Sequence, residues 1–219
     1  MDSQALQRLL IWLSPAFPVG SFAWSGGLET AIAENQVRSA KATEAWVKGS
    51  LEAGAIATDA ILLAHAYGAA GEPELLGELA DLSLALTASA ERHAETTTTG
   101  RAFLVAAAAW GELDPSTLPD PCPYPVAVGA LAGRQHVPLS ATLTAFIAAV
   151  VHAQVSVAVR LVPIGQTAGL TILAALEDTI AETANRAHNS SLEQIGTMAY
   201  AADIAQMRHE TLQPRLFRS

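Results

Sequence analysis

Apolar residues recur at intervals of three and four along almost the whole chain, and this spacing sets the limits on its fold. The pattern begins with Leu6, Leu9, Leu10 and Leu13. Such spacing places side chains on one face of an α-helix. The sequence contains no apolar–polar alternation long enough for a strand, no hairpin dipeptide between apolar runs and no internal repeat. It therefore predicts an all-α fold, a single-domain bundle of about nine or ten helices that spans residues 1–219.

Prolines, glycines and N-capping residues divide this pattern into helices. Ser39 or Thr43 is expected to cap a helix that continues to His65, and Ser190 with Glu193 matches a capping box before the last helix. Proline fits the first turn of a helix and interrupts its interior. The expected helices occupy residues 6–13, 28–35, 39–65, 75–101, 102–110, 124–131, 138–162, 166–180 and 192–212, with a turn at 185–191 and a proline-rich surface excursion at 111–125.

Composition and charge exclude several classes of protein. Hydrophobic residues make up 51% of the chain and charged residues 15%, which excludes intrinsic disorder. The net charge of -9 provides no basic surface for nucleic acid. Cys122 is the single cysteine, so no disulfide can form within the chain, and the N-terminus lacks the basic region and long apolar core of a signal peptide. A cytoplasmic location is expected.

The apolar stretch at residues 141–162 is long enough to be considered as a membrane span. It carries His152 and Gln154 near its middle and Arg160 near its end. Ionisable residues are rare inside spanning helices. We therefore expect a helix buried inside a soluble bundle and no membrane span.

Motifs for catalysis and for metal or cofactor binding are missing. The six histidines are scattered, without the spacing of metal ligands, and there is no nucleophile elbow. The glycine-rich loop at residues 15–30 has no lysine after its glycines, which excludes a phosphate-binding loop. The sequence predicts no catalytic, metal or cofactor site. One enzymatic alternative remains, a helical enzyme that uses the acid–base cluster Glu91, Arg92, His93, Glu95 and Arg101.

The end of the chain, residues 203–219, packs several charged residues into a few positions of an otherwise low-charge chain. Pro214 is expected to stop the last helix and leave a short tail with Leu216 and Phe217 between arginines. Chain ends seldom carry such apolar mass unless something covers it. The tail either folds back onto its own core or binds a partner, because arginine and aromatic residues are favoured at interface centres. The loop at 15–30, with Phe22 and Trp24, is likewise either a core-filling loop or a binding loop.

Four stretches in this order resemble the urease accessory protein F (UreF) family. They are residues 13–29 (LSPAFPVGSFAWSGGLE), 124–129 (YPVAVG), 166–169 (QTAG) and 207–219 (MRHETLQPRLFRS), and they span nearly the whole chain. The resemblance implies an all-helical homodimer that is not an enzyme. It also implies a bridge between the accessory protein UreD, called UreH in some species, and the GTPase UreG. This assembly inserts nickel into apo-urease as GTP is hydrolysed.

The resemblance also implies where the partners bind. The helix end and tail at 203–219 would form or order the partner-binding surface, with the loop around Phe22 close to it. The chain departs from the family pattern at Phe22, Trp24, Tyr124 and the threonine run 96–99, which affects the details of contact. The expected partner-binding residues are Phe22, Trp24, Gln166, Arg208, His209, Glu210, Arg215, Leu216, Phe217 and Arg218.

Overall fold

The structure is a computed structural model that describes residues 2–111 and 117–219 of the chain. Those residues form helices and connecting segments with no strand among them, which confirms the all-α prediction. Residues 112–116 of the expected proline-rich excursion lie outside the described part. The elements are α1 (Ser3–Trp12), η1 (Ser21–Ala23), α2 (Leu28–Ala33), α3 (Ala40–Ala53), α4 (Ala55–Gly68), α5 (Pro73–Ala85), α6 (Ala90–Ala107), η2 (Ala108–Trp110), α7 (Tyr124–Arg134), α8 (Leu139–Leu161), α9 (Gly165–Ala175), α10 (Glu177–Asn189), η4 (Leu192–Gln194) and α11 (Tyr200–His209).

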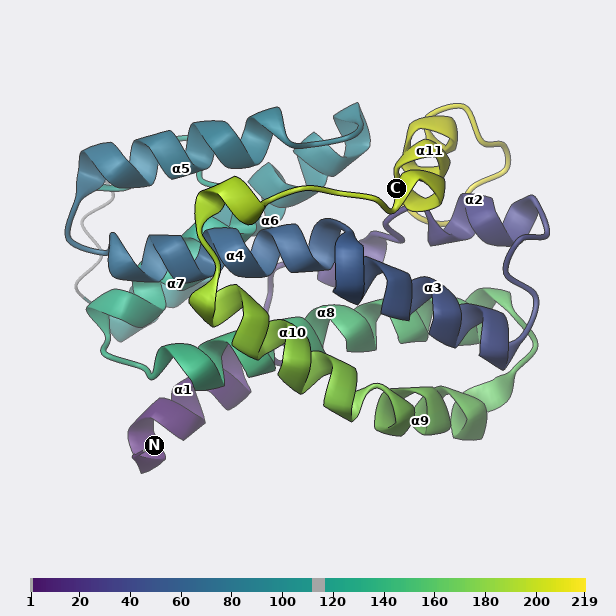
Figure 1. Ribbon diagram of the computed structural model, residues 1–219, viewed down its shortest axis with the longest axis horizontal. Coiled ribbons are helices and arrows are strands. Elements are labelled where there is room, and N and C mark those ends of the chain that lie inside the picture. Colours follow the sequence, from purple (N-terminus) through teal and green to yellow (C-terminus); the bar gives the residue numbers. More distant parts are fainter. Residues whose placement is uncertain (1, 112–116) are drawn as a thin grey trace.

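Helix α4 is the centre of the bundle. Its most extensive packing is against α7, and it also contacts α3, α5, α8 and α10 (Figure 1). Gly129 and Gly133 on α7 allow this close approach, because a Cβ atom at Gly129 would lie 2.3 Å from the Leu63 carbonyl oxygen and one at Gly133 would lie 2.5 Å from that of Tyr67. Two backbones therefore touch along one face of α7, and the other helices surround them.

An aromatic cluster fixes the loop that follows α1. Trp12, Phe17, Phe103 and Tyr124 are linked ring to ring, with centroids 5.7 Å apart for both Phe17–Phe103 and Phe103–Tyr124. The Trp12–Phe103 and Phe103–Tyr124 contacts are edge-to-face, and such contacts add to the free energy gained from burial. The loop expected at 15–30 is thus partly a core-filling loop, with Phe17 inside the bundle.

Helix α8 is the expected long apolar helix. By length and composition it is the one helix in the described part of the chain that could cross a membrane, and 44% of its most apolar window is buried inside the protein. Its buried residues include Leu143, Phe146, Ile147 and Val151, which belong to the main core. Its packing agrees with the expected bundle helix.

Two expected helices are each split in two. Gly54 adopts an extended conformation between α3 and α4, so the helix predicted from Ser39 ends at Ala53 and a new one begins at Ala55. The helix predicted for 75–101 breaks before Ser89, whose side chain accepts the Arg92 N–H at 3.0 Å and caps α6. The apolar periodicity reveals neither break.

The last third of the chain differs more from prediction. The helix expected for 166–180 divides into α9 and α10, and the turn expected at 185–191 is helical to Asn189 because Arg186 and Thr183 bind the Leu51 carbonyl oxygen at 2.8 and 3.1 Å. The capping box forms at Ser191 and closes only the short helix η4. An extended segment follows, and α11 begins at Tyr200 rather than Leu192.

The single cysteine is buried beside the start of α7. Burial, and the nearby Asp120 carboxylate, raise the pKa of the Cys122 thiol to about 12. Its carbonyl oxygen lies against Gly100 of α6, where an added Cβ would be 2.0 Å away. The thiol therefore lies within a tightly packed junction between α6 and α7.

Candidate functional site

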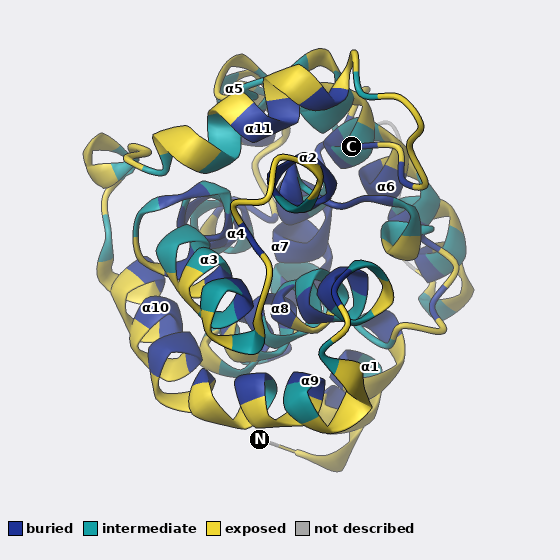
Figure 2. Ribbon diagram, turned by 90° about the vertical axis from the view of Figure 1, so that its right-hand side faces the viewer, coloured by how far each residue is buried: buried dark blue, intermediate teal, exposed yellow. Residues whose placement is uncertain are grey.

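Residues 210–219, here called the C-terminal segment, fold back onto the body of the protein. The chain end lies beside α2 and close to α6 (Figure 2). The Arg218 N–H donates to the Ala23 carbonyl oxygen at 2.8 Å, and the Ser25 N–H donates to the Ser219 carbonyl oxygen at 2.6 Å. The loop between η1 and α2 therefore holds the segment through its backbone.

Glu29 is the main anchor of the C-terminal segment. Its side chain lies at the start of α2, the residue is 6% exposed, and its two oxygens accept the N–H groups of Leu216 and Phe217 at 2.7 and 2.9 Å. One oxygen also contacts Nε2 of His209 at 2.9 Å. Burial raises the pKa of the Glu29 carboxyl, but the hydrogen bonds from His209 and the two backbone N–H groups outweigh burial, so this pKa lies below its usual value.

His209, the last residue of α11, lies between two carboxylates. The residue is 0% exposed, and its Nδ1 lies 2.7 Å from an oxygen of Glu91 on α6. The other Glu91 oxygen accepts a hydrogen bond from Arg215 of the C-terminal segment. The segment is thus joined to α2 through Glu29 and to α6 through Glu91.

Phe217 is buried by its own chain, which corrects the expectation that a partner shelters it. The residue is 7% exposed and packs in a second apolar cluster with Leu28, Val37 and Val157, while the Arg160 guanidinium lies 5.5 Å from the centre of its ring. Leu216, in contrast, is 81% exposed.

A glycine makes this arrangement possible. Gly27 has a φ of +82° at the N-terminus of α2, and a Cβ there would lie 2.8 Å from the Gln206 backbone nitrogen. Helix α11 therefore lies against the backbone of α2, which brings His209 to Glu29.

The other predicted partner-binding residues divide into three groups. Arg208 pairs with Glu34, the Glu210 carboxylate accepts the Ala90 N–H at the start of α6, and Arg218 lies over the ring of the buried Trp24. Phe22 projects from η1 and is 64% exposed. Gln166 is exposed at the start of α9, and this helix packs on α8, α3 and α10. The C-terminal segment instead contacts α2, α6 and the loop around η1. The structure brings all of them except Gln166 to one region.

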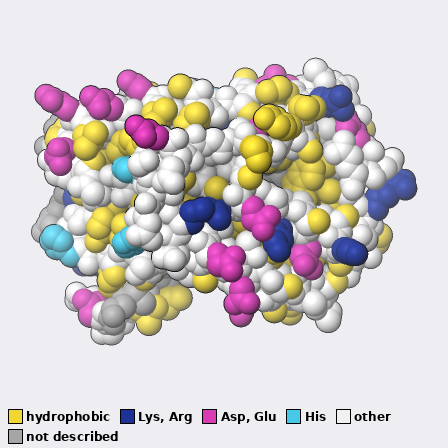
Figure 3. All heavy atoms as spheres, in the orientation of Figure 1, with side chains coloured by type: hydrophobic (Ala, Val, Ile, Leu, Met, Phe, Trp, Pro, Cys, Tyr) yellow, Lys and Arg dark blue, Asp and Glu magenta, His cyan; other side chains and the backbone are white. Residues whose placement is uncertain are grey.

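Sequence reasoning missed an apolar ridge on α11. Tyr200, Ile204 and Met207 follow i, i+4, i+7 spacing and are exposed, as is Met198 just before the helix. Hydrophobic side chains gather on this face near α11 (Figure 3). The spacing was visible in the sequence, but α11 buries its opposite face, which carries Ala205, Gln206 and His209. An exposed apolar ridge on a helix indicates a contact surface.

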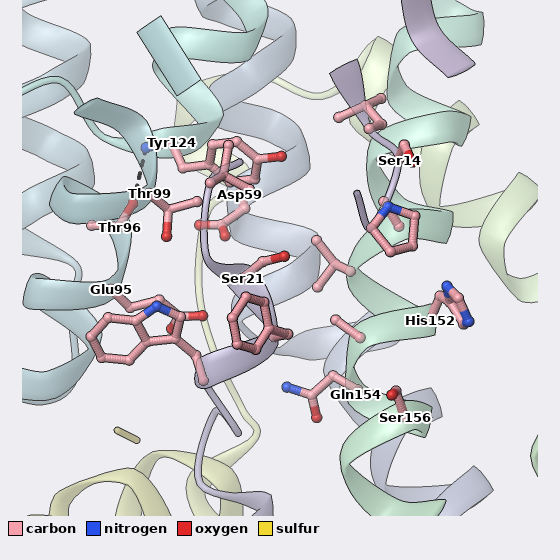
Figure 4. A pocket seen from close by; sticks show the side chains of 18 of the residues that line it. Ser14, Ser21, Asp59, Glu95, Thr96, Thr99, Tyr124, His152, Gln154 and Ser156 are labelled. Carbon is pink, nitrogen blue, oxygen red and sulfur yellow. Dashed lines mark hydrogen bonds between the residues drawn. The ribbon is translucent and has the colours of Figure 1, made fainter. Parts of the chain in front are cut away.

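A pocket of about 150 Å³ lies between the η1 loop, α6 and α8 (Figure 4). Its lining includes Asp59, Arg92 and Glu95, and Arg92 forms ion pairs with both carboxylates. Asp59 of α4 is largely buried in its ion pair with Arg92 of α6. Burial raises the pKa of Asp59, and Arg92 offsets part of that effect.

The acid–base cluster of the enzymatic alternative is not assembled into one site. Glu91 binds the C-terminal segment, Arg92 and Glu95 face the pocket, and His93 and Arg101 are exposed. The Thr97 hydroxyl donates a hydrogen bond to the His93 carbonyl oxygen one turn earlier, as threonines within helices commonly do. Among residues 2–111 and 117–219, no group of three or more His, Cys, Asp or Glu side chains is arranged to hold a metal ion.

Comparison with known proteins gives one consistent result. The family model UreF matches residues 37–177. The urease accessory protein UreF of Rhizobium leguminosarum bv. viciae is 48% identical over 218 residues, which cover 100% of this chain and 98% of the relative. The UreF protein of Agrobacterium fabrum is 48% identical over 215 residues, 98% of this chain and 96% of the relative. That of Rhodopseudomonas palustris is 46% identical over 222 residues, 98% and 93% respectively.

Proposed function

Because the chain belongs to the urease accessory protein UreF family, we propose that it is a non-catalytic assembly factor for the nickel centre of urease. In this proposal it acts in the cytoplasm as a homodimer, bridges UreD/UreH and the GTPase UreG, and presents them to apo-urease. A two-fold dimer offers two copies of each contact surface. The hydrolysis of GTP belongs to UreG, since this sequence has no phosphate-binding loop.

The observation that carries the proposal is the exposed apolar surface at the chain end. Leu216 protrudes from an anchored segment, and Met198, Tyr200, Ile204 and Met207 form the ridge on the neighbouring helix. Apolar side chains held in place by a rigid support lose little conformational entropy on binding. This supports a docking surface for a protein partner, with Phe22 on the adjoining η1.

A docking role also agrees better with the arginines than a direct role in GTP hydrolysis. An arginine that stabilises transition-state charge must reach the phosphates. Arg215 is bound to Glu91, and Arg218 lies over Trp24. To act on nucleotide, either side chain would first have to leave its own partner. We therefore propose that these arginines help to hold and shape the surface, and that UreG is influenced through contact.

Leu216→Asp is expected to weaken the capture of UreD/UreH, and with it UreG, by at least about tenfold, because it places a charge within the proposed apolar docking surface. The side chain is 81% exposed, so folding should be unaffected. The measurement is size-exclusion chromatography with UreD and UreG, with and without nucleotide, alongside circular dichroism.

The matched control is Val105→Asp. Val105 is also exposed and lies on α6, about 20 Å along the helix from Glu91 at 1.5 Å per residue. The Val105→Asp variant should capture UreD/UreH and UreG as the wild type does. Full capture by the Leu216→Asp variant would refute the docking surface.

A further inference from the structure

His209 makes contacts that a neutral imidazole cannot satisfy together. Its Nε2 lies 2.9 Å from Glu29 and its Nδ1 lies 2.7 Å from Glu91. A neutral ring has one N–H donor and one bare nitrogen, and only the imidazolium donates from both. With both carboxylates ionised, a neutral ring would set the lone pair of one nitrogen against a carboxylate oxygen.

Both carboxylates also accept hydrogen bonds from donors other than His209. Glu29 accepts two backbone N–H groups from the C-terminal segment, and its pKa lies below the usual value. The second oxygen of Glu91 accepts from the Arg215 guanidinium. The proton needed to complete this arrangement therefore belongs on the ring of His209, which water does not reach.

Charged groups on the neighbouring elements are mostly engaged elsewhere. Arg208 pairs with Glu34, Arg92 pairs with Asp59 and Glu95, and the Glu210 carboxylate caps α6 at Ala90. Several charged or titratable groups lie on the elements packed against His209. They are Glu29 on α2 and Glu34 just after it, Glu91, Arg92, His93, Glu95 and Arg101 on α6, Tyr200, Asp203 and Arg208 on α11, and Glu210, Arg215 and Arg218 in the C-terminal segment.

We propose that Glu29, His209 and Glu91 form a proton-dependent latch that positions the C-terminal segment. The latch is closed while His209 is protonated and both carboxylates are ionised. The same Glu29 carboxylate accepts the N–H groups of Leu216 and Phe217. Its hydrogen bond with His209 and its hydrogen bonds with the C-terminal segment are therefore coupled. Loss of one His209 proton leaves the ring a single N–H donor, so α11 loses its hydrogen bond to one of the two carboxylates and the segment detaches.

The direction of the pH dependence follows from these charges. His209 gains its partners in the protonated form, so its contribution is present at lower pH and is lost as pH rises through its deprotonation. Glu29 has a lowered pKa, so its contribution is present above the usual glutamate range and is lost as pH falls towards its own titration. The latch therefore holds within a window of pH, and rising pH opens it through His209.

The consequence for partner capture rests on the proposed function. In the docked segment, Leu216 is exposed while Phe217 fills the apolar cluster beside α2. A chain with an open latch would offer a partner a detached segment, which must be ordered again at a cost in affinity. Capture of UreD/UreH is then expected to weaken as pH rises through the titration of His209.

The test uses the isolated full-length protein and needs no partner. Nuclear magnetic resonance follows protonation of both His209 ring nitrogens across a pH series, and amide hydrogen exchange at Leu216 and Phe217 is measured in the same samples and corrected for the intrinsic rate. The expected result is that both nitrogens carry protons while the segment is docked, and that the second proton and the amide protection are lost together as pH rises.

Variants separate the latch from general effects of pH. His209→Gln keeps one donor but cannot titrate, so amide exchange at residues 216 and 217 should rise at least about tenfold at neutral pH and show no step in the histidine range. His93→Gln, which removes an exposed histidine on the same helix as Glu91, should behave like the wild type. If the His209→Gln variant proves unfolded by circular dichroism, the wild-type series decides alone.

Three results would overturn the latch: a docked segment whose His209 ring carries one proton at every pH, loss of the second proton without loss of protection, or an unchanged pH step in His209→Gln. Failure of the latch with capture still abolished by Leu216→Asp would leave the proposed function intact. A working latch with capture indifferent to Leu216→Asp would refute the docking surface alone.

Discussion

Replacing Gly129 by alanine is expected to lower the free energy of unfolding by about 3 kcal/mol or more, since it overpacks the centre of the bundle. The added Cβ would lie 2.3 Å from the Leu63 carbonyl oxygen and 3.1 Å from the Tyr67 nitrogen, both backbone atoms of α4. Neither can rotate away as a side chain could. Helices α4 and α7 would have to separate, and this is the most extensive helix pair of the fold.

Denaturant unfolding followed by circular dichroism measures this effect. The control is Gly77→Ala on α5, where an added Cβ has nothing within 4 Å. That change should stabilise the protein by about 0.5–1 kcal/mol, because alanine favours a helix interior over glycine. Equal effects of the two substitutions would show that α4 and α7 do not make backbone contact.

Arg92→Met is expected to cost about 3–5 kcal/mol, because it leaves the buried Asp59 carboxylate without its counter-ion. The Arg92 guanidinium is largely buried and binds both Asp59 and Glu95. Burial acts to lower the pKa of Arg92, but the two carboxylates outweigh it and raise that pKa. The Arg92 guanidinium therefore stays positively charged and is the counter-ion of both Asp59 and Glu95.

A double-mutant cycle measures the coupling within this pair. Asp59→Asn combined with Arg92→Met should recover part of the lost stability, since no uncompensated aspartate remains. Lys48→Met is the control, because Lys48 and Glu52 form an exposed pair worth less than about 1 kcal/mol. Additive losses at positions 59 and 92 would contradict the coupling.

The Arg92→Met variant should also show a distinct pH dependence. Burial already raises the pKa of Asp59, and removal of Arg92 would raise it further. A carboxyl with a raised pKa favours folding below its unfolded value, near 4, and that contribution is lost as pH rises. The variant should therefore lose stability relative to wild type as pH increases above about 4. A pH-independent difference would show that Asp59 is not the affected group.

The fold class was predictable because helical periodicity runs through most of the chain. Ser39 as a helix cap and Pro125 in the first turn of α7 were readable for the same reason, since each acts within a few residues. The break between α3 and α4 at Gly54 was not predictable from local sequence. Glycine is tolerated inside helices, and this one is extended because the Met198 N–H reaches the Ala53 carbonyl oxygen from the far end of the sequence.

The site was only half predictable. Arg215 and His209 stood out as part of a dense cluster in a chain of low charge content. Of the carboxylates to which they bind, Glu29 looked like an ordinary first-turn acid of α2, and Glu91 was considered only as part of a possible acid–base cluster. Such residues favour helix N-termini in any case. Their role depends on α11 crossing α2 at Gly27, a long-range contact that no local pattern encodes.

The buried thiol of Cys122 is unreactive towards thiol-modifying reagents at neutral pH. Only the thiolate reacts with electrophiles, and a pKa of about 12 leaves almost none at neutral pH. A cysteine introduced at position 216 would ionise near 8.5, as an exposed thiol does. A maleimide dye would then mark that one position and report when the chain end lifts away, with the native sulfur left in place.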